Sequence, residues 1–437
     1  MASVGQILHL QIEKPAAGGR MIARAEGAVV FVAGAIPGER VAARVTRVAR
    51  GVVFADTVSV DQASPDRRDP FCDGACGGTV YAHIAYDRQL AIKAEVVADG
   101  LQRIGRLAPP SPIQVAGSVA EGYRLRARLH VQGGRVGFFR EGSHQLCDPR
   151  PTRQLLPDTC DVLERIAAVL GDGGDSHVRE LDVSENIAAT TRAVHLDVDG
   201  GLSEARVEAV SRVPGLTGLT LTSRAVPDTP PRTRLISGDP YVYDRLEIGT
   251  AEVVLRRHVQ SFFQANRYLV RAFVTHVSTL VPAGQRVVDL YAGVGLFAVS
   301  LGRVGAASVV AVEGDPIAAR DLEINASAVP GVTVHHEPVE RFLERRPAVP
   351  EVVVLDPPRT GLSAEALRGL LTLRAPRLVY VSCDIATFAR DARALAAAGY
   401  RLDRIDGFDL FPNTPHVETV AAFGLDEASG SGPSAPR

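Results

Sequence analysis

The chain lacks tryptophan and has little methionine, few aromatic residues and almost no lysine. It contains two Met, aromatic residues make up 5% of it, and among 48 basic residues only Lys14 and Lys93 are lysines. No apolar run is long enough to span a bilayer, so we expect no membrane segment. The N-terminus has no charged start followed by a long apolar core, which argues against a signal peptide.

Cysteine and net charge are also scarce. Five unevenly spaced cysteines and no export signal favour the reducing cytoplasm. A net charge of −2 and a pI near 6.6 exclude a global positive field. A nucleic-acid partner would therefore need a local basic patch. Arginine, which supplies nearly all of the positive charge, suits phosphate contacts.

A length of 437 residues predicts two or three domains. Residues 4–60 alternate apolar and polar positions between glycine turns and predict about five short strands, an OB-like barrel. Helical patterns follow in "YDRQLAIKAEVVADGLQRI" and "DTCDVLERIAAVL". We expect these boundaries: a barrel over 1–62, a central mixed α/β domain over 63–255, a third domain over 256–424 and a disordered tail over 425–437.

From residue 256 strand and helix patterns alternate, which predicts an α/β, Rossmann-like doubly wound sheet. Two last strand patterns, "YRLDRIDGFDLF" and "HVETVAAF", are joined by the turn "PNTP", so we expect them to pair antiparallel.

The segment "VVDLYAGVGLF" (287–297) is typical of a strand, a glycine loop and a helix that together approach a ligand. A redox dinucleotide fold would carry a third glycine, and Ala298 stands there instead. The next strand ends in Glu313, where an acid can bind ribose hydroxyls. The alternative is an ordinary α/β fold in which this acid is a solvated strand end.

Residues whose side chains can bind ligands or react stand where the predicted parallel strands end. Asp356 ends the strand in "VVVLDPPRTGL", and Tyr291, Glu313 and Cys383 hold equivalent places. Ligands of open α/β sheets bind beyond the carboxyl ends of the strands, so these residues should share one rim.

Cys383 in "LVYVSCDIATFARD" could be a small buried hydrophobe, a metal ligand or a nucleophile. It ends a strand and opens a helix, where amide dipoles lower a thiol pKa. Asp384 is a plausible N-cap, and its charge would partly offset that effect.

Glu418 begins the last predicted strand, which an antiparallel course would bring to the rim of Cys383. A thiol, a carboxylate and a nucleotide-like pocket together suggest nucleophilic catalysis with proton abstraction. The alternative is a strand-edge charge.

In "YRLRARLHV" (123–131) the residues Arg124, Arg126 and Arg128 share one face of a predicted strand. We expect a phosphate-binding stripe there, although a solvated edge face would show the same pattern.

Five motifs together resemble one family: "SFFQANRYL", "DLYAGVGLF", "DPPRTGL", "YVSCDIATFARD" and "FPNTPHVETV". Their order and spacing are similar to those of S-adenosylmethionine-dependent RNA 5-methyluridine methyltransferases. Residues 18–45 resemble the TRAM domain of that family, an RNA-binding barrel, and "YRLRARLHV" and the pattern from Cys76 to Lys93 also match. The resemblance covers nearly the whole chain.

The resemblance implies an N-terminal TRAM barrel, a class I methyltransferase domain and methylation of uridine C5 in structured RNA. It implies that Gln264, Tyr291, Glu313 and Asp356 bind S-adenosylmethionine, Cys383 adds to C6 and Glu418 removes the C5 proton. It favours 23S ribosomal RNA over transfer RNA. We also expect a monomer in the cytoplasm. The alternatives are a transfer RNA enzyme, an inactive RNA-binding homologue and a cytosine C5 methyltransferase.

Many family members bind a [4Fe–4S] cluster through four cysteines. Cys72, Cys76 and Cys147 match those positions, but Thr79 replaces the fourth cysteine. Four thiolates are the usual requirement, so we expect no cluster and no other metal.

Overall fold

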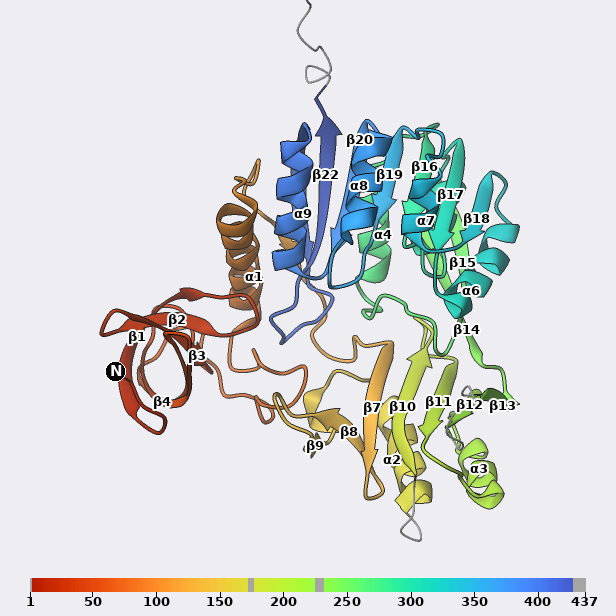
Figure 1. Ribbon diagram of the computed structural model, residues 1–437. Helices are drawn as coiled ribbons and strands as arrows, with labels where there is room; N and C mark the ends of the chain where they lie inside the picture. Colours follow the sequence, from red (N-terminus) through yellow and green to blue (C-terminus); the bar gives the residue numbers. More distant parts are fainter. Residues whose placement is uncertain (1, 172–176, 225–231, 427–437) are drawn as a thin grey trace, which may run out of the picture.

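The computed structural model describes residues 2–171, 177–224 and 232–426. Figure 1 shows a small barrel and a central sheet on one side, and a larger α/β sheet on the other. The sequence predicted this combination of barrel, mixed α/β part and Rossmann-like part, and the fold is confirmed. Among the described residues, no helix has the length and hydropathy to cross a membrane.

The N-terminal barrel is closed in the strand order β1-β2-β3-β5-β4. Its strands alternate buried and exposed side chains, because successive residues of a strand point to opposite faces. The strands are β1 Ile7–Pro15, β2 Met21–Ala25, β3 Ala28–Ala33, β4 Arg40–Ala49 and β5 Val52–Gln62.

A helix and a short strand link the barrel to the last sheet. Helix α1 (Tyr86–Gly100) ends in a π-helical turn, Leu101–Gly105, and β6 (Val115–Ala116) joins the edge of the C-terminal sheet beside β21. Apolar residues of α1 belong to one core with those of the barrel and of the C-terminal part. Figure 1 shows α1 beside α9.

The central sheet has the order β13-β12-β11-β10-β7-β8-β9, covered by α2 and α3. Its elements are β7 Arg126–Gln132, β8 Arg135–Phe139, β9 Leu146–Cys147, α2 Pro157–Gly171, β10 Val178–Glu185, β11 Arg192–Val198, α3 Glu204–Ser211, β12 Gly218–Ser223 and β13 Arg232–Gly238, with a 3₁₀ turn at Arg150–Thr152. A hairpin follows, β14 Tyr241–Ile248 and β15 Ala251–His258, and shares a core with α4 and α5.

The C-terminal sheet has the order β18-β17-β16-β19-β20-β22-β21-β6. Its parallel strands are nearly continuous apolar runs, as β19 (VVVL) illustrates, because helices cover both faces. The strands are β16 Arg286–Leu290, β17 Ser308–Glu313, β18 Val332–His336, β19 Val352–Leu355, β20 Arg377–Ser382, β21 Tyr400–Phe408 and β22 Glu418–Leu425. The helices are α4 Val270–Thr279, α5 Leu296–Arg303, α6 Pro316–Ser327, α7 Val339–Glu344, α8 Ala364–Leu373 and α9 Ile385–Ala397.

Strand β22 runs antiparallel between β20 and β21, as the sequence predicted for the last pair of strands. Its first residue therefore lies at the edge where the parallel strands end. This edge faces the barrel and the central sheet (Figure 1). Of the predicted tail, Leu425 still belongs to β22, and residues 427–437 lie outside the described residues.

Candidate active site

The sheet topology brings the predicted rim residues to one edge. Tyr291 follows β16, Glu313 ends β17, Asp356 follows β19 and Cys383 follows β20. Glu418 starts β22 at the same edge, because Ser382 pairs with Thr419 across β20 and β22. Their common location agrees with the sequence analysis, whereas their chemical roles stay predictions.

The glycine loop after β16 has a backbone that few residue types adopt. Gly293 and Gly295 have φ of 56° and 95°, and Tyr291 itself has φ of 63°. A bulky residue at positive φ is strained, and such strain concentrates at ligand sites. A Cβ on Gly293 would meet nothing within 4 Å, whereas one on Gly295 would lie 2.7 Å from Leu322 Cδ1. Gly295 therefore serves helix packing, and Gly293 leaves open space at the rim.

Glu313 is tied to this loop. Its carboxylate accepts hydrogen bonds from the amides of Gly293, 2.7 Å to Oε2, and Asp315, 2.6 Å to Oε1. Asp315 in turn caps α6 through the amides of Ile317 and Ala318. Each Glu313 oxygen keeps a second lone pair, which a ribose hydroxyl could use.

Asp289, on β16, is an acid that the sequence analysis missed. It is fully buried, and neither carboxyl oxygen has a hydrogen-bond partner of good geometry among the described residues. Burial and then the charge of Asp356 hold its pKa well above the usual range. Its position within "VVDLYAG", just before the glycine loop, was the signal available.

Asp356 and Gln264 face each other at the same edge. Gln264 Nε2 donates to Asp356 Oδ2 at 3.2 Å. Desolvation raises the pKa of Asp356, and the Gln264 hydrogen bond lowers it by a smaller amount. The resulting pKa is about 7. A set of buried acids with raised pKa values and orphaned oxygens is stabilised by a bound cation. S-adenosylmethionine carries a sulfonium and an ammonium, so these residues fit that cofactor.

Cys383 is half-buried at the start of α9. Burial, then the charges of Glu418 and Asp356, raise the pKa of its thiol to about 11. The lowering that we expected from the helix dipole is thus outweighed. Asp384 is the N-cap, as predicted: its carboxylate accepts from the amides of Ala386 and Thr387.

Arg359 is the second residue that the sequence analysis missed. The charge and a hydrogen bond of its guanidinium lower the pKa of the Cys383 thiol, although burial and the nearby acids raise that pKa more strongly. Glu418 is buried, and its pKa is raised by burial and by Asp356, while Arg359 lowers it. Arg359 therefore favours the ionised form of both the Cys383 thiol and the Glu418 carboxyl. It lies in the "DPPR" segment that also carries Asp356.

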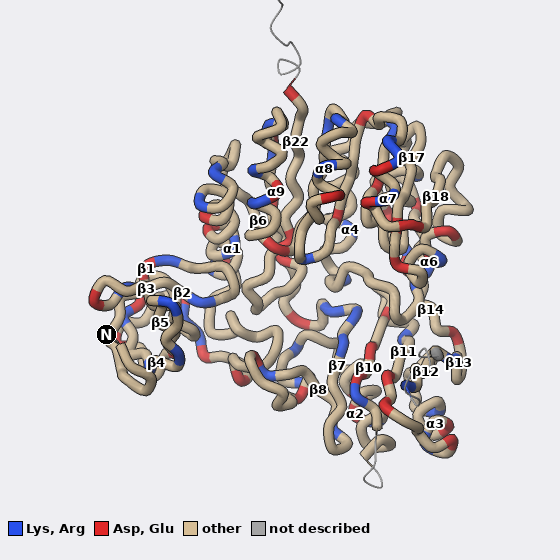
Figure 2. Tube along the Cα trace, in the orientation of Figure 1, with Lys and Arg blue, Asp and Glu red and all other residues tan. Residues whose placement is uncertain are grey.

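The arginine stripe differs in part from its prediction. Strand β7 begins at Arg126, so Arg124 precedes it, although the predicted alternation of faces is present. Arg128 Nε lies 3.1 Å from Asp182 Oδ1, and Arg126 Nη2 lies 3.7 Å from the same atom. Arg124 donates to Gln154 Oε1 at 2.7 Å. Figure 2 shows the basic positions of β7 beside acidic positions of β10, so much of this charge is compensated.

The barrel carries an aromatic and basic patch. The rings of Phe31 and Phe54 stack with centroids 5.6 Å apart. The guanidinium of Arg47 lies over the Phe54 ring at 4.1 Å, and that of Arg20 lies at 5.9 Å. Both rings are half-buried and Arg47 is exposed. Arginine and aromatic faces are the means by which proteins bind single-stranded nucleic acid.

The cysteine loop does not fit a [4Fe–4S] cluster. Cys76 and Cys147 form a disulfide, which was not expected from the sequence because spacing does not reveal which cysteines meet. Thr79 Oγ1 donates to the carbonyls of Cys76 at 2.8 Å and Asp73 at 3.1 Å. Cys72 keeps a free thiol. Within the described ranges no group of three or more His, Cys, Asp or Glu could hold a metal ion.

Comparisons with known proteins give the family of this chain. A TRAM domain model matches residues 2–58, and a model described as tRNA (Uracil-5-)-methyltransferase matches residues 348–423. The 23S rRNA (uracil(1939)-C(5))-methyltransferase RlmD of Halomonas elongata is 35% identical, over 94% of this chain and 88% of that protein. The chain belongs to the RNA uracil-C5 methyltransferase family. It is an S-adenosylmethionine-dependent enzyme that acts on RNA.

One further relative supports this assignment, and one solved structure supports the fold. The RlmD protein of Pseudomonas putida is 32% identical, over 96% of this chain and 94% of that protein. The crystal structure of Pyrococcus abyssi tRNA (uracil-54, C5)-methyltransferase in complex with S-adenosyl-L-homocysteine has a TM-score of 0.72 at 24% identity. It covers 95% of this chain and 100% of that one, so the two family members share their fold.

Proposed function

We propose that this enzyme methylates C5 of a uridine in 23S ribosomal RNA, with Cys383 as nucleophile and Glu418 as base. The observation that carries the proposal is that Cys383, directly after β20, and Glu418, the first residue of the neighbouring strand β22, lie at one sheet edge, where the charges of Glu418 and of the buried acid Asp356 act on the thiol. Family membership supports the reaction, and relatives named as 23S rRNA methyltransferases support the choice of RNA.

We further propose that Gln264, Tyr291, Glu313 and Asp356 bind S-adenosylmethionine, together with Asp289. Glu313 would hold the ribose hydroxyls, and the open space at Gly293 would admit the ligand. The buried acids would lie near its positive charges. When bound, the cofactor supplies an electrophilic methyl group on its sulfonium.

In this mechanism the Cys383 thiolate adds to C6 of the uracil, and C5 becomes an enolate-like carbon able to accept a methyl group. Glu418 then takes the C5 proton, the electrons of the C5–H bond form the C5=C6 double bond, and the bond from C6 to Cys383 Sγ breaks. Arg359 favours the thiolate and the carboxylate that these steps need. The target base must leave its stack to reach the pocket.

We propose that the chain forms three domains and that the RNA binds between them. The barrel over 1–62, a central domain over 63–255 and the methyltransferase domain over 256–424 surround the edge that bears Cys383. The Phe31–Phe54 patch would contact RNA, and of the predicted stripe Arg124, Arg126 and Arg128 the exposed member, Arg128, would do so as well. We expect a cytoplasmic monomer without an iron–sulfur cluster.

The decisive experiment maps 5-methyluridine in RNA from cells that lack the gene. Loss of one 5-methyluridine in 23S rRNA, restored by the wild-type gene and not by Cys383→Ala, is the expected result. Loss from transfer RNA instead would overturn the choice of RNA. Loss of 5-methylcytidine would identify a cytosine enzyme, and no loss of any modified nucleoside would identify an inactive RNA-binding homologue.

A further inference from the structure

The loop between β21 and β22, residues 409–417, leads directly into Glu418 and is held by residues far away in sequence. Asp409, Leu410, Asn413 and Thr414 are buried in it, and Asn413 has a φ of 63°. Two prolines interrupt regular backbone hydrogen bonding at Pro412 and Pro415. Glu418 pairs with Phe408, the residue just before the loop, so the contacts that fix the loop act on both neighbours of the Glu418 position, in addition to the strand pairing.

Lys93 and Asp409 form the innermost of these contacts. Lys93 Nζ lies 2.5 Å from Asp409 Oδ1, and both side chains are fully buried. The same ammonium donates to the carbonyl of Phe411 at 3.2 Å. One lysine thus holds a side chain and a main-chain group of the loop.

The choice of lysine at this position is itself informative. The chain uses arginine almost everywhere, and Lys93 is one of two lysines. An ammonium is a compact charge with three donors, whereas a guanidinium is a broad planar fork. The compact ammonium of Lys93 can contact both Asp409 and the Phe411 carbonyl within one buried site.

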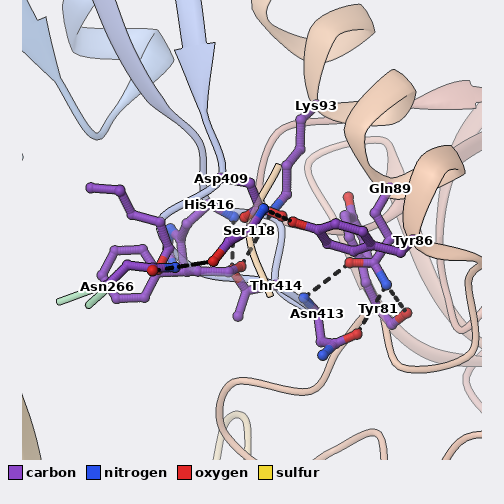
Figure 3. A network of polar contacts seen from close by, with 12 residues as sticks. Tyr81, Tyr86, Gln89, Lys93, Ser118, Asn266, Asp409, Asn413, Thr414 and His416 are labelled. Carbon is purple, nitrogen blue, oxygen red and sulfur yellow. Dashed lines mark hydrogen bonds and ion pairs between the residues drawn. The ribbon is translucent and has the colours of Figure 1, made fainter. Parts of the chain in front are cut away.

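Gln89 lies one helical turn before Lys93 and also forms hydrogen bonds with the loop. Its Oε1 accepts from the amide of Asn413 at 2.9 Å, and its Nε2 donates to Asn413 Oδ1 at 3.0 Å. The Tyr81 amide also donates to the Asn413 carbonyl at 2.9 Å. Asn413 is thereby held in its left-handed conformation by side chain and backbone (Figure 3).

The opposite side of the loop is held by Asn266, next to the cofactor-side residue Gln264. Asn266 Nδ2 donates to the Leu410 carbonyl at 3.2 Å and to Ser118 Oγ at 3.0 Å. Tyr86 of α1 accepts from the Ser118 amide at 2.7 Å. Figure 3 shows these residues converging on the loop from α1 and from the segments around 118 and 266.

A buried ion pair is a poor device for stability, because desolvation offsets its attraction and an apolar pair of similar size is often as stable. In some proteins such a pair instead fixes a defined arrangement of the groups that it joins. We propose that Lys93 and Asp409 are a positioning pair, which aims Glu418 at C5 of the uracil and so controls the release of the methylated RNA from Cys383. This inference rests on the proposed roles of Cys383 and Glu418.

The step concerned is the last one in the reaction. Glu418 takes the C5 proton, the C5–H electron pair becomes the C5=C6 double bond, and the Cys383 thiolate leaves C6. Formation of the adduct and methyl transfer require Cys383 and the cofactor, and only release requires Glu418. A misplaced Glu418 should therefore leave an enzyme joined to methylated RNA.

The test uses the full chain, labelled S-adenosylmethionine and total RNA from cells that lack the gene. Asp409→Asn and Lys93→Met are expected to lower turnover by about 10²-fold, as misplacement of a reacting group by about 1 Å does, with the KM for the cofactor within about twofold. Labelled enzyme–RNA adduct should accumulate on denaturing gels. The control is Lys14→Met, which removes the other lysine and its 2.7 Å ion pair with Asp99 of α1, and should neither slow turnover nor trap adduct.

A lower turnover without accumulated adduct, or a loss explained by a raised KM, would overturn the positioning role. If either single variant does not fold, the double variant Lys93→Met, Asp409→Leu removes both charges together and is expected to fold and still trap adduct. Glu418→Gln separates this inference from the proposed function. If Glu418→Gln traps adduct and the Lys93 and Asp409 variants do not, only the positioning role fails; if Glu418→Gln traps none, the proposed base is wrong.

Discussion

The charge of Glu418 acts on the Cys383 thiol across the neighbouring strands β20 and β22. After burial, it is the largest cause that raises the pKa of Cys383, to about 11, and Asp356 adds to it. The Cys383 thiol is thus protonated at neutral pH while these acids are ionised and no cation is bound. A cofactor with positive charge would lower this pKa, so we expect ionisation of the proposed nucleophile to depend on the methyl donor.

The thiol pKa can be measured from the rate of Cys383 alkylation against pH, read by mass spectrometry of its peptide. We expect a midpoint near the pKa of about 11 for the free enzyme. Glu418→Gln should lower the midpoint because it removes a negative charge, and Arg359→Met should raise it because it removes a positive one. S-adenosylmethionine should lower it more than S-adenosylhomocysteine, whose sulfur is neutral. Shifts of the same sign in the two variants would contradict this electrostatic account.

Cofactor affinity should depend on pH through Asp356. Its pKa is raised to about 7, so the carboxyl loses its charge as the pH falls through that value. We expect calorimetry to show weaker S-adenosylmethionine binding at pH 6 than at pH 8, with proton release on binding. Asp356→Asn should lower affinity by on the order of 1.5–3 kcal/mol and remove most of the pH dependence. Glu365→Gln, on the exposed face of α8, is the control that should change neither.

Calorimetry of cofactor binding also tests whether Asp289 takes part in that binding. Asp289→Asn keeps the shape of the side chain and should weaken S-adenosylmethionine binding, since an amide cannot ionise to meet the positive charge of the cofactor. A larger loss for S-adenosylmethionine than for S-adenosylhomocysteine would place Asp289 near the sulfonium, and equal losses would place it near the ammonium. Unchanged affinity for both ligands would show that Asp289 has no part in binding.

The barrel patch should contribute to RNA affinity in two separable ways. Phe54→Ala should cost on the order of 1–3 kcal/mol, the value of one stacked base, without changing the salt dependence. Arg47→Ala should lower the slope of affinity against salt by about one unit if its guanidinium contacts a phosphate. Val58→Ala, an exposed apolar residue on the same strand as Phe54, is the matched control. Filter binding of 23S rRNA fragments at several salt concentrations measures all three.

The disulfide between Cys76 and Cys147 predicts how many cysteine thiols will react with a thiol reagent. Protein unfolded without reductant should react at three thiols, those of Cys72, Cys160 and Cys383, and at five after reduction. Thr79→Cys supplies a fourth thiolate position and, after anaerobic reconstitution with iron and sulfide, should bind more iron than the wild-type protein. Stoichiometric iron and sulfide in the wild-type protein would show that three thiolates suffice here.

Local patterns in the sequence were enough to predict the order of the helices and strands and most of the residues at the carboxyl ends of the parallel strands. Period-two alternation marks the barrel strands, apolar runs mark the parallel strands, and the rule that ligands lie at strand ends selects Tyr291, Glu313, Asp356 and Cys383. Asp384 as N-cap and the antiparallel last strand also followed from neighbours along the chain. Each of these features depends on residues within one element or one turn, which a sequence displays directly.

The tertiary structure decided what depends on long-range contact. Arg126 and Arg128 meet Asp182 only because β7 and β10 pair, and Asp289 becomes an unpaired acid only inside the folded sheet. Cys76 meets Cys147 through the packing of the central part. Lys93 reaches Asp409 across 316 positions of the chain. Charge compensation, desolvation and the fixed conformation of the 409–417 loop arise from such contacts, and no local pattern encodes which distant residue will lie beside another.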